Sequence, residues 1–320
     1  MNPTTAPVWK VLVTGATGFV GREVVRQLRA HGHTVRALVR RPQSAVAETL
    51  AQTAGVELAP GDILDTEAVR TAAAGTQAVV HLVGIIREFG NQTFETMHVQ
   101  ATRHVVQAAT AAGVQRLVHV SALGTRPDAP SRYHRTKWQA EELVRHSGLP
   151  WVILRPSLIY GPGDQFINLF ARISRYSPVL PLFGRPTSLF QPVFIRVVGR
   201  CAAGALTHPE AVGQTFDVCG PERLTLEAML RCLLALLNRK RLLLHVPLPL
   251  ARVLAAFLER ICPTLLRQPP PFNRDQLLML CEDNIGDPEP ANRLFQLHHP
   301  TFREGLATWI TPTPPKPAPG

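Results

Sequence analysis

A tyrosine and a lysine four positions apart are the residues of this chain best suited to acid–base chemistry. Tyr133 and Lys137 begin and end the sequence Tyr-His-Arg-Thr-Lys, within a stretch of helical spacing over residues 132–146. Positions four apart share one face of a helix, and a nearby ammonium lowers the pKa of a phenol, which can then act as a general acid or base. With three tyrosines and four lysines in 320 residues, chance predicts roughly 0.04 such pairs. We therefore expect Tyr133 and Lys137 to belong to a site.

A glycine-rich turn follows the first apolar run of the chain. Thr14 is followed by Gly-Ala-Thr-Gly-Phe-Val-Gly, directly before a helical stretch. In such a turn the first glycine permits a tight bend, and the second lets the backbone approach a pyrophosphate at a helix N-terminus. The third permits close packing of helix on sheet. The turn therefore predicts a dinucleotide site, with contacts expected from Gly15, Thr17, Gly18, Phe19, Val20 and Gly21.

The end of the second apolar run indicates which dinucleotide is bound. An NAD site usually has Asp or Glu there for the ribose hydroxyls, whereas an NADP site has Arg. Arg40 and Arg41 follow this run, and no acidic residue occurs before Glu48. A guanidinium can hold a 2′-phosphate through two hydrogen bonds, and the alternative is a solvated pair of arginines. We expect NADP(H) to be preferred over NAD(H).

Two further pairs of candidates follow the third and fourth apolar runs. Asp62 and Ile63 come after the third run, where a carboxylate can accept a hydrogen bond from an adenine amino group or cap the helix that follows. Val83 and Gly84 come after the fourth run, where a small residue lets the cofactor pass. Their order along the chain supports one continuous cofactor site.

The elements that must position these residues alternate between short apolar runs and longer amphipathic stretches. Such alternation specifies a parallel sheet with helices on both faces. We therefore predict an α/β fold, a doubly wound parallel-sheet Rossmann domain. The predicted strands are residues 10–14, 34–39, 56–59, 78–82, 116–121 and 151–155, and the predicted helices are residues 22–30, 44–53, 66–74, 94–112 and 132–146.

The second half of the chain has more prolines and longer helical stretches, so we expect it to form a smaller α-rich cap over the nicotinamide end of the site. We expect residues 189–198 to return to the first domain as a strand. The predicted organisation is a disordered tail over 1–8, an NAD(P)-binding domain over 9–160, a cap and partner-binding region over 161–310, and a disordered proline-rich tail over 311–320.

The composition limits the protein's surroundings. Its 34 basic and 23 acidic residues give a formal net charge of +11 with no basic tail, which suits an anionic cofactor, an acidic membrane face or an acidic partner rather than nucleic acid. Five scattered cysteines indicate reduced thiols, and the histidines lack metal-site spacing, so no metal is expected. We expect no secretory signal, because residues 1–10 lack an apolar core, and there is no apolar run of about 18–20 residues. We expect a cytoplasmic protein, peripheral on the cytoplasmic membrane face of a bacterium-like cell.

One basic and amphipathic stretch lies within the second half. Arg-Lys-Arg at 239–241 precedes three leucines, and residues 249–266 carry apolar side chains at helical spacing. A buried core helix is the simpler interpretation. A surface that rests on a membrane or on a partner helix is the other.

Together these motifs resemble those of the atypical and extended short-chain dehydrogenases/reductases. The resemblance covers residues 10–163 and includes Leu-Arg-Pro at 154–156 and Tyr-Gly-Pro-Gly at 160–163. It implies that Tyr133 and Lys137 are catalytic, together with Ser121 at the end of the fifth strand. It also implies that the nicotinamide is contacted through the backbone of Pro156, Ser157, Leu158 and Ile159.

The later segments are similar to one branch of that family. These segments are Leu-Phe-Gln-Pro-Val at 189–193, Gly-Pro-Glu at 220–222, Asn-Arg-Asp-Gln-Leu at 273–277 and Glu-Asp-Asn at 282–284. The branch contains the NAD(P)H-binding accessory subunit of respiratory complex I and its bacterial relatives. Members of this branch often bind NADPH tightly without known turnover, so the resemblance implies binding rather than catalysis.

Two departures from the family pattern bear on catalysis. Ser121 is followed by Ala122 and Leu123, so it either polarises a carbonyl or only caps the strand. The family often has an aspartate in the returning strand, where this chain has Arg-Val-Val at 196–198. The leading hypothesis is an NADP(H)-binding accessory or assembly subunit with a protein partner in a membrane redox complex. The alternatives are an NADPH-dependent reductase or epimerase acting on a quinone, isoprenoid or other small carbonyl substrate, and an NADPH-sensing regulator.

Overall fold

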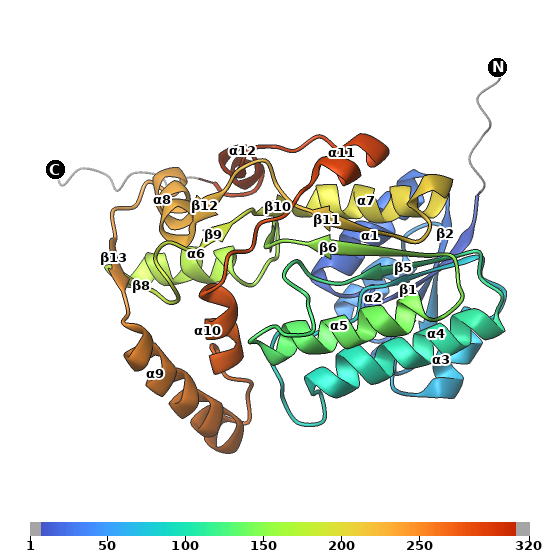
Figure 1. Ribbon diagram of the computed structural model, residues 1–320, viewed down its shortest axis with the longest axis horizontal. Coiled ribbons are helices and arrows are strands. Elements are labelled where there is room, and N and C mark those ends of the chain that lie inside the picture. Colours follow the sequence, from blue (N-terminus) through green and yellow to red (C-terminus); the bar gives the residue numbers. More distant parts are fainter. Residues whose placement is uncertain (1–7, 312–320) are drawn as a thin grey trace. The chain divides into compact units, whose positions relative to one another are not determined.

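A seven-stranded parallel sheet forms the centre of the first part of the computed structural model, which describes residues 8–311 (Figure 1). The strand order is β11-β6-β5-β4-β1-β2-β3, so the order reverses between β1 and β4, where doubly wound sheets bind ligands. Val11, Leu12 and Val13 are fully buried, as strands covered by helices on both faces require. The predicted doubly wound α/β Rossmann fold is confirmed. The strands are β1 (Lys10–Thr14), β2 (Thr34–Val39), β3 (Val56–Pro60), β4 (Ala78–His81), β5 (Arg116–Val120), β6 (Trp151–Pro156) and β11 (Gln214–Val218).

Helices cover both faces of this sheet. On one face α1 packs against α7, and on the other α4 packs between α3 and α5 (Figure 1). Gly199 of α7 approaches α1 so closely that a Cβ there would lie 2.8 Å from Glu23 Cγ. Ser44, Asp65 and Ser131 cap the N-termini of α2, α3 and α5, and each side chain accepts a hydrogen bond from at least one backbone amide. The helices are α1 (Phe19–Ala30), α2 (Ala45–Ala51), α3 (Thr66–Ala73), η1 (Glu95–Gln100), α4 (Ala101–Ala111), α5 (Arg132–Arg145), α7 (Ile195–Thr207), η2 (Pro209–Ala211) and α11 (Glu289–Phe295).

The first of two compact units is built from three separate segments of the chain, namely residues up to Pro156, Ile195–Val218 and Asp287–His298. Residues 189–198 were predicted to return to the first domain as a strand. The chain does return to the first unit at Ile195, but Ile195 begins helix α7, and residues 189–194 belong to the second unit. The strand that returns to the sheet is β11, paired with β6. Residues 195–198 are rich in β-branched side chains, which favour a strand in isolation, but packing against α1 selects a helix. Val197 and Val198 are buried within that helix, which explains why an acidic residue is absent there.

The second unit consists of Ser157–Phe194, Cys219–Gly286 and the described residues from His299 onward. Short strands pair as β7–β10 and β8–β13 in parallel and as β9–β12 antiparallel. Tyr160 is buried edge-on to Phe302, with ring centroids 4.8 Å apart, and burial raises the pKa of its phenol. The elements are β7 (Ile159–Tyr160), α6 (Ile167–Tyr176), β8 (Val179–Leu182), β9 (Leu189–Phe190), β10 (Val193–Phe194), β12 (Leu224–Thr225), α8 (Leu226–Leu236), β13 (Leu242–His245), α9 (Leu248–Ile261), η3 (Cys262–Leu266), α10 (Arg274–Leu280) and α12 (Phe302–Ala307).

Helix α9 is not the buried core helix that the sequence favoured. Its buried residues are Ala251 and Ala255, whereas large apolar side chains lie on its exposed face. Among residues 8–311, no helix has both the length and the apolar character needed to cross a membrane. The tails predicted to be disordered, 1–8 and 311–320, lie outside the described residues apart from Val8 and Thr311.

Candidate functional site

The glycine turn joins β1 to α1 at the carboxyl end of the sheet. Gly15 has φ +76°, a conformation that favours glycine, and its carbonyl accepts a hydrogen bond from the Gly18 amide at 3.0 Å. A Cβ on Gly21 would lie 2.7 Å from Ala16 Cα, so this glycine permits the close packing of α1 on the turn. These two glycines are therefore required by the fold itself.

Gly18 is the glycine that the fold alone does not require. It is exposed, its φ of −72° suits any residue, and a Cβ would meet only the Gly15 carbonyl oxygen at 3.1 Å. Gly18 is also the N-cap of α1, whose first turn carries no acidic residue and whose first amides donate no hydrogen bond to a capping side chain. An open, uncapped helix N-terminus fits a pyrophosphate, and a side chain at Gly18 would occupy that space. Thr17, Phe19 and Val20 flank this position and are partly exposed.

Arg40 and Arg41 follow β2, and both are exposed. The Gln92 amide, with its oxygen turned toward Arg40, accepts hydrogen bonds from that guanidinium at 2.5 and 3.3 Å. Arg40 therefore reaches from the end of β2 to the loop that follows β4. The Arg41 carbonyl accepts from the Ser44 amide and hydroxyl, which fixes the bend before α2.

The residues after β3 and β4 line the same edge of the sheet. Asp62 accepts a hydrogen bond from the Leu64 amide at 3.0 Å, and Asp65 rather than Asp62 caps α3. The capping alternative for Asp62 is therefore excluded. Ile63 is buried, Val83 is half-buried and Gly84 is exposed. A Cβ on Gly84 would meet only His98, at 3.6 Å in ordinary contact.

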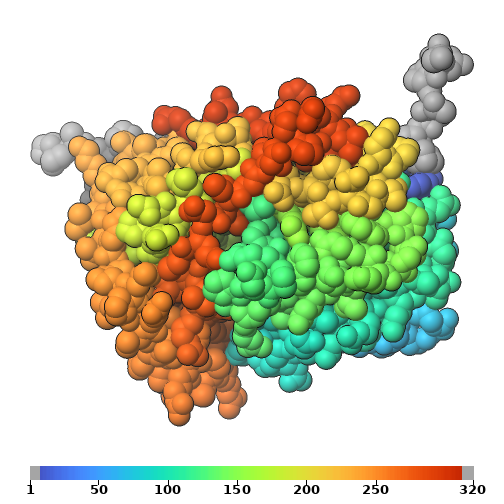
Figure 2. Space-filling model, in the orientation of Figure 1, coloured from blue at the N-terminus to red at the C-terminus, as the bar shows by residue number. Residues whose placement is uncertain are grey.

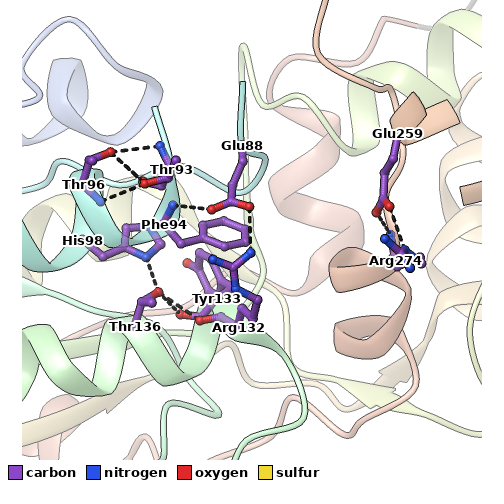
Figure 3. Close-up of polar contacts among 10 residues, drawn as sticks. All are labelled: Glu88, Thr93, Phe94, Thr96, His98, Arg132, Tyr133, Thr136, Glu259 and Arg274. Atoms are coloured by element: carbon purple, nitrogen blue, oxygen red, sulfur yellow. Dashed lines mark hydrogen bonds and ion pairs between the residues drawn. The ribbon is translucent and has the colours of Figure 1, made fainter. Parts of the chain in front are cut away.

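Tyr133 lies in the first turn of α5, enclosed by aromatic rings (Figure 3). Its ring contacts Phe94, His98 and His134 edge-on, with centroids 5.9, 5.3 and 5.2 Å apart. One carboxylate oxygen of Glu88 accepts from the Phe94 amide at 2.8 Å, and the other pairs with Arg132 at 3.1 Å. The loop after β4 is thereby tied to α5 beside Tyr133.

Lys137 lies one turn further along α5 and is buried. Its Nζ donates a hydrogen bond to the Val120 carbonyl at 2.8 Å, at the carboxyl end of β5. Burial lowers the pKa of the ammonium to about 8. The Lys137 head group is therefore held one residue before Ser121.

Ser121 is buried, and its hydroxyl lies 3.4 Å from Thr125 Oγ1. Ala122 follows it, and the Leu123 amide donates to the carbonyl of Pro156 at the end of β6. Ser157, Leu158 and Ile159 belong to the second unit. The Ser157 hydroxyl donates a hydrogen bond to the Gln191 carbonyl at 2.5 Å. The Val193 amide donates to the Leu158 carbonyl, and Ile159 pairs with Val193 between β7 and β10.

Three buried histidines lie near Lys137, and the sequence indicated of the histidines only that they lack metal-site spacing. His81 of β4 and His119 of β5 are neighbours in the sheet, with rings 5.3 Å apart, and His98 Nδ1 lies 2.8 Å from Thr136 Oγ1. Burial, together with the Lys137 charge, lowers the pKa of all three, that of His81 to about 3. Strand register brings His81 and His119 together, and no spacing in the sequence shows it. Within residues 8–311, no three His, Cys, Asp or Glu side chains form a group suited to a metal.

The strand order, the open glycine turn and the lysine at the end of β5 define a Rossmann-type NAD(P)-binding protein. Its residues 15–166 match the family model described as NAD(P)H-binding. The chain belongs to the short-chain dehydrogenase/reductase family.

Similar proteins include both complex I subunits and reductases. NADH dehydrogenase [ubiquinone] 1 alpha subcomplex subunit 9 of Arabidopsis thaliana is 29% identical over 85% of this chain and 70% of its own length. The 2-alkyl-3-oxoalkanoate reductase of Stenotrophomonas maltophilia is 30% identical over 93% of this chain and 97% of its own length. The alignments with the plant, rat and mouse complex I subunits span about two thirds of those proteins.

The solved structures that are similar show the same fold. UDP-glucuronic acid 4-epimerase from Bacillus cereus, in complex with UDP-glucuronic acid and NAD, superposes with a TM-score of 0.72 at 19% identity. The match covers 93% of this chain and 96% of the epimerase.

Proposed function

We propose that this protein is an NADP(H)-binding accessory or assembly subunit of a membrane redox complex, peripheral on the cytoplasmic membrane face. One contrast within the site carries the proposal. The turn that would hold the pyrophosphate is open at Gly18, whereas Ser121 is buried against Thr125 and is followed by Ala122. A serine in this position is poorly placed to polarise a substrate carbonyl. The similarity to complex I subunits of plants and mammals supports a place in a multisubunit redox complex.

Recovery from membranes tests this proposal directly. Tagged protein isolated from detergent-solubilised membranes of the source cells is expected to carry NADPH and to co-purify with a complex that has quinone oxidoreductase activity. A matched preparation from washed soluble extract controls for adventitious association. Recovery of the tagged protein alone, without such a complex, would contradict the accessory function.

We expect NADPH to bind at least about tenfold more tightly than NADH, because a charge-assisted contact to the 2′-phosphate is worth about 1.5–3 kcal/mol. Replacing both Arg40 and Arg41 with serine should remove most of that preference by weakening NADPH binding alone. Fluorescence titration with each cofactor measures it. Arg103→Ser, at an exposed position of α4, is the matched control. Equal affinity of the unmodified protein for both cofactors would contradict the assignment.

The alternative function is an NADPH-dependent reductase or epimerase for a quinone, isoprenoid or other small carbonyl substrate. Two observations favour it. Tyr133 and Lys137 share α5, with Lys137 held at the end of β5, and the similarity to the alkanoate reductase extends over 97% of that enzyme. NADPH would supply the hydride, and Tyr133 would hold the proton that a carbonyl oxygen takes up.

Tyr133→Phe separates the two functions. For an accessory subunit we expect NADPH affinity and complex recovery to stay within about threefold, because phenylalanine keeps the ring contacts with Phe94 and His98. Lys137→Met should weaken NADPH binding more, since its ammonium can donate to ribose hydroxyls. NADPH oxidation against a quinone or carbonyl substrate that falls about 10²–10⁴-fold in Tyr133→Phe would favour the reductase instead.

A further inference from the structure

Helix α9 of the second unit turns small apolar residues toward the protein and large apolar residues toward the surface. A core helix would show the reverse arrangement. Ala251 and Ala255 are buried, whereas Leu250, Val253 and Phe257 are 59%, 66% and 58% exposed. Leucine and phenylalanine gain most from burial, and a helix that only supported the fold would turn them inward. This exposed apolar face therefore indicates contact with a partner outside the core of the protein.

The exposed apolar residues form a continuous stripe. Leu250, Val253, Leu254 and Phe257 follow the spacing i, i+3, i+4 and i+7, which places them within an arc of about 100°. Beyond the helix, Leu265 and Leu266 of η3 are 77% and 57% exposed and extend the apolar surface. Figure 2 shows this segment, in orange, at the surface of the protein.

The charge along this stripe is positive. Residues 248–267 contain three arginines and one acidic residue, Glu259. Both carboxylate oxygens of Glu259 accept hydrogen bonds from Arg274, one from its amide and one from its Nε, each at 2.7 Å (Figure 3). The only acid of the segment is thus already neutralised, and Arg252, Arg260 and Arg267 are exposed.

We propose that α9 and η3 form a surface that lies in the plane of an anionic phospholipid bilayer. An apolar stripe flanked by arginines is the arrangement of interfacial helices, which bury the stripe at the headgroup boundary while the cations meet lipid phosphates. A second copy of this chain is disfavoured as the occupant, because two such surfaces would bring like charges together. This inference deepens the proposed function and rests on it for the presence of a membrane.

Vesicle co-sedimentation of the full-length protein tests the surface. We expect binding to vesicles of phosphatidylcholine with phosphatidylglycerol to exceed binding to phosphatidylcholine alone at least about tenfold, and to weaken as salt rises. Val253→Glu/Phe257→Glu should lower binding at least about tenfold. Tyr176→Glu/Val212→Glu, at exposed apolar positions outside the surface, is the matched control and should bind like the unmodified protein.

The arginines have a control of their own. Arg252→Gln/Arg260→Gln should weaken binding to the anionic vesicles severalfold, and Arg103→Gln on α4 should not. Retention of a native melting temperature by each variant shows that it is folded. Unchanged binding in Val253→Glu/Phe257→Glu would overturn the proposal. The proposal would also be overturned if the unmodified protein formed a dimer and did not bind vesicles, and if Val253→Glu/Phe257→Glu dissociated that dimer.

The two proposals fail separately. Loss of vesicle binding with normal recovery of a redox complex would overturn the lipid surface and leave the accessory function intact. Normal vesicle binding with no recoverable complex would overturn the accessory function and leave the lipid surface intact.

Discussion

Gly18→Val is expected to abolish NADP(H) binding while the protein remains folded. Gly18 has a backbone conformation that valine tolerates, and the new Cβ meets only the Gly15 carbonyl oxygen at 3.1 Å, which a small backbone shift relieves. The side chain would instead fill the space above the first amides of α1. Losing two or more charge-assisted contacts of about 1.5–3 kcal/mol each raises the Kd for NADPH at least about 100-fold. Isothermal titration with NADPH measures the loss, and circular dichroism confirms the fold.

Gly21→Ala is the informative comparison. Its Cβ would lie 2.7 and 2.8 Å from backbone atoms of Ala16, so this variant should lose stability as well as binding. Gly75→Ala is a control for the loss of a glycine outside the site, because Gly75 has a positive φ but no neighbour within 4 Å of its Cβ position. A folded Gly18→Val protein that binds NADPH with unchanged affinity would exclude the glycine turn as the pyrophosphate site.

Glu141→Ala is expected to lower the free energy of unfolding by about 3–5 kcal/mol. Glu141 is fully buried on α5 and accepts hydrogen bonds from Arg155 at 2.9 and 2.6 Å and from Arg145 at 2.6 Å. Both guanidinium groups also lie over the Trp138 ring, at 4.9 and 5.9 Å from its centroid. Removing the carboxylate that they share leaves two partly buried guanidinium groups facing each other, of which Arg145 keeps another carboxylate partner in Glu142. Urea denaturation followed by circular dichroism measures the change.

Glu142→Ala serves as the matched control for that prediction. The neighbouring Glu142 also pairs with Arg145 at 2.6 Å, but its side chain is 38% exposed. Exposed ion pairs contribute about 0–1 kcal/mol, so this variant should remain close to the unmodified protein. If the two substitutions lowered the free energy of unfolding by similar amounts, burial of Glu141 would not determine how much its ion pairs contribute to stability.

The sheet and the glycine turn were predictable because their signals are local. The apolar runs at β1 and β4 and the glycines of residues 15–21 identify themselves within a few residues. The helix over 195–207 could not be predicted from the sequence. Its β-branched residues favour a strand, and only packing against α1 selects the helix. Strand β11 was missed because Thr215 and Asp217 interrupt its apolar pattern on the half-buried side of a sheet edge.

The environment of the candidate site was less accessible to sequence analysis. The contact of His81 with His119 depends on strand register, and the Lys137 bond to Val120 depends on where α5 crosses β5. The stripe on α9 was visible as an amphipathic pattern, but the pattern does not say which side faces the core. The small size of Ala251 and Ala255 was the signal that the large residues lie outside.

The three-segment construction of the first unit has a consequence for synthesis of the chain. When residues up to Pro156 have emerged from the ribosome, β6 forms one edge of the sheet, with Val152, Ile153 and Leu154 in it, and its partner β11 has not yet been made. An apolar edge strand without its partner is a template for pairing with other chains. The nascent protein therefore passes through an aggregation-prone stage that lasts until residue 218 emerges. Fragments that end soon after Pro156 keep that open edge permanently, so they will need chaperones to remain soluble.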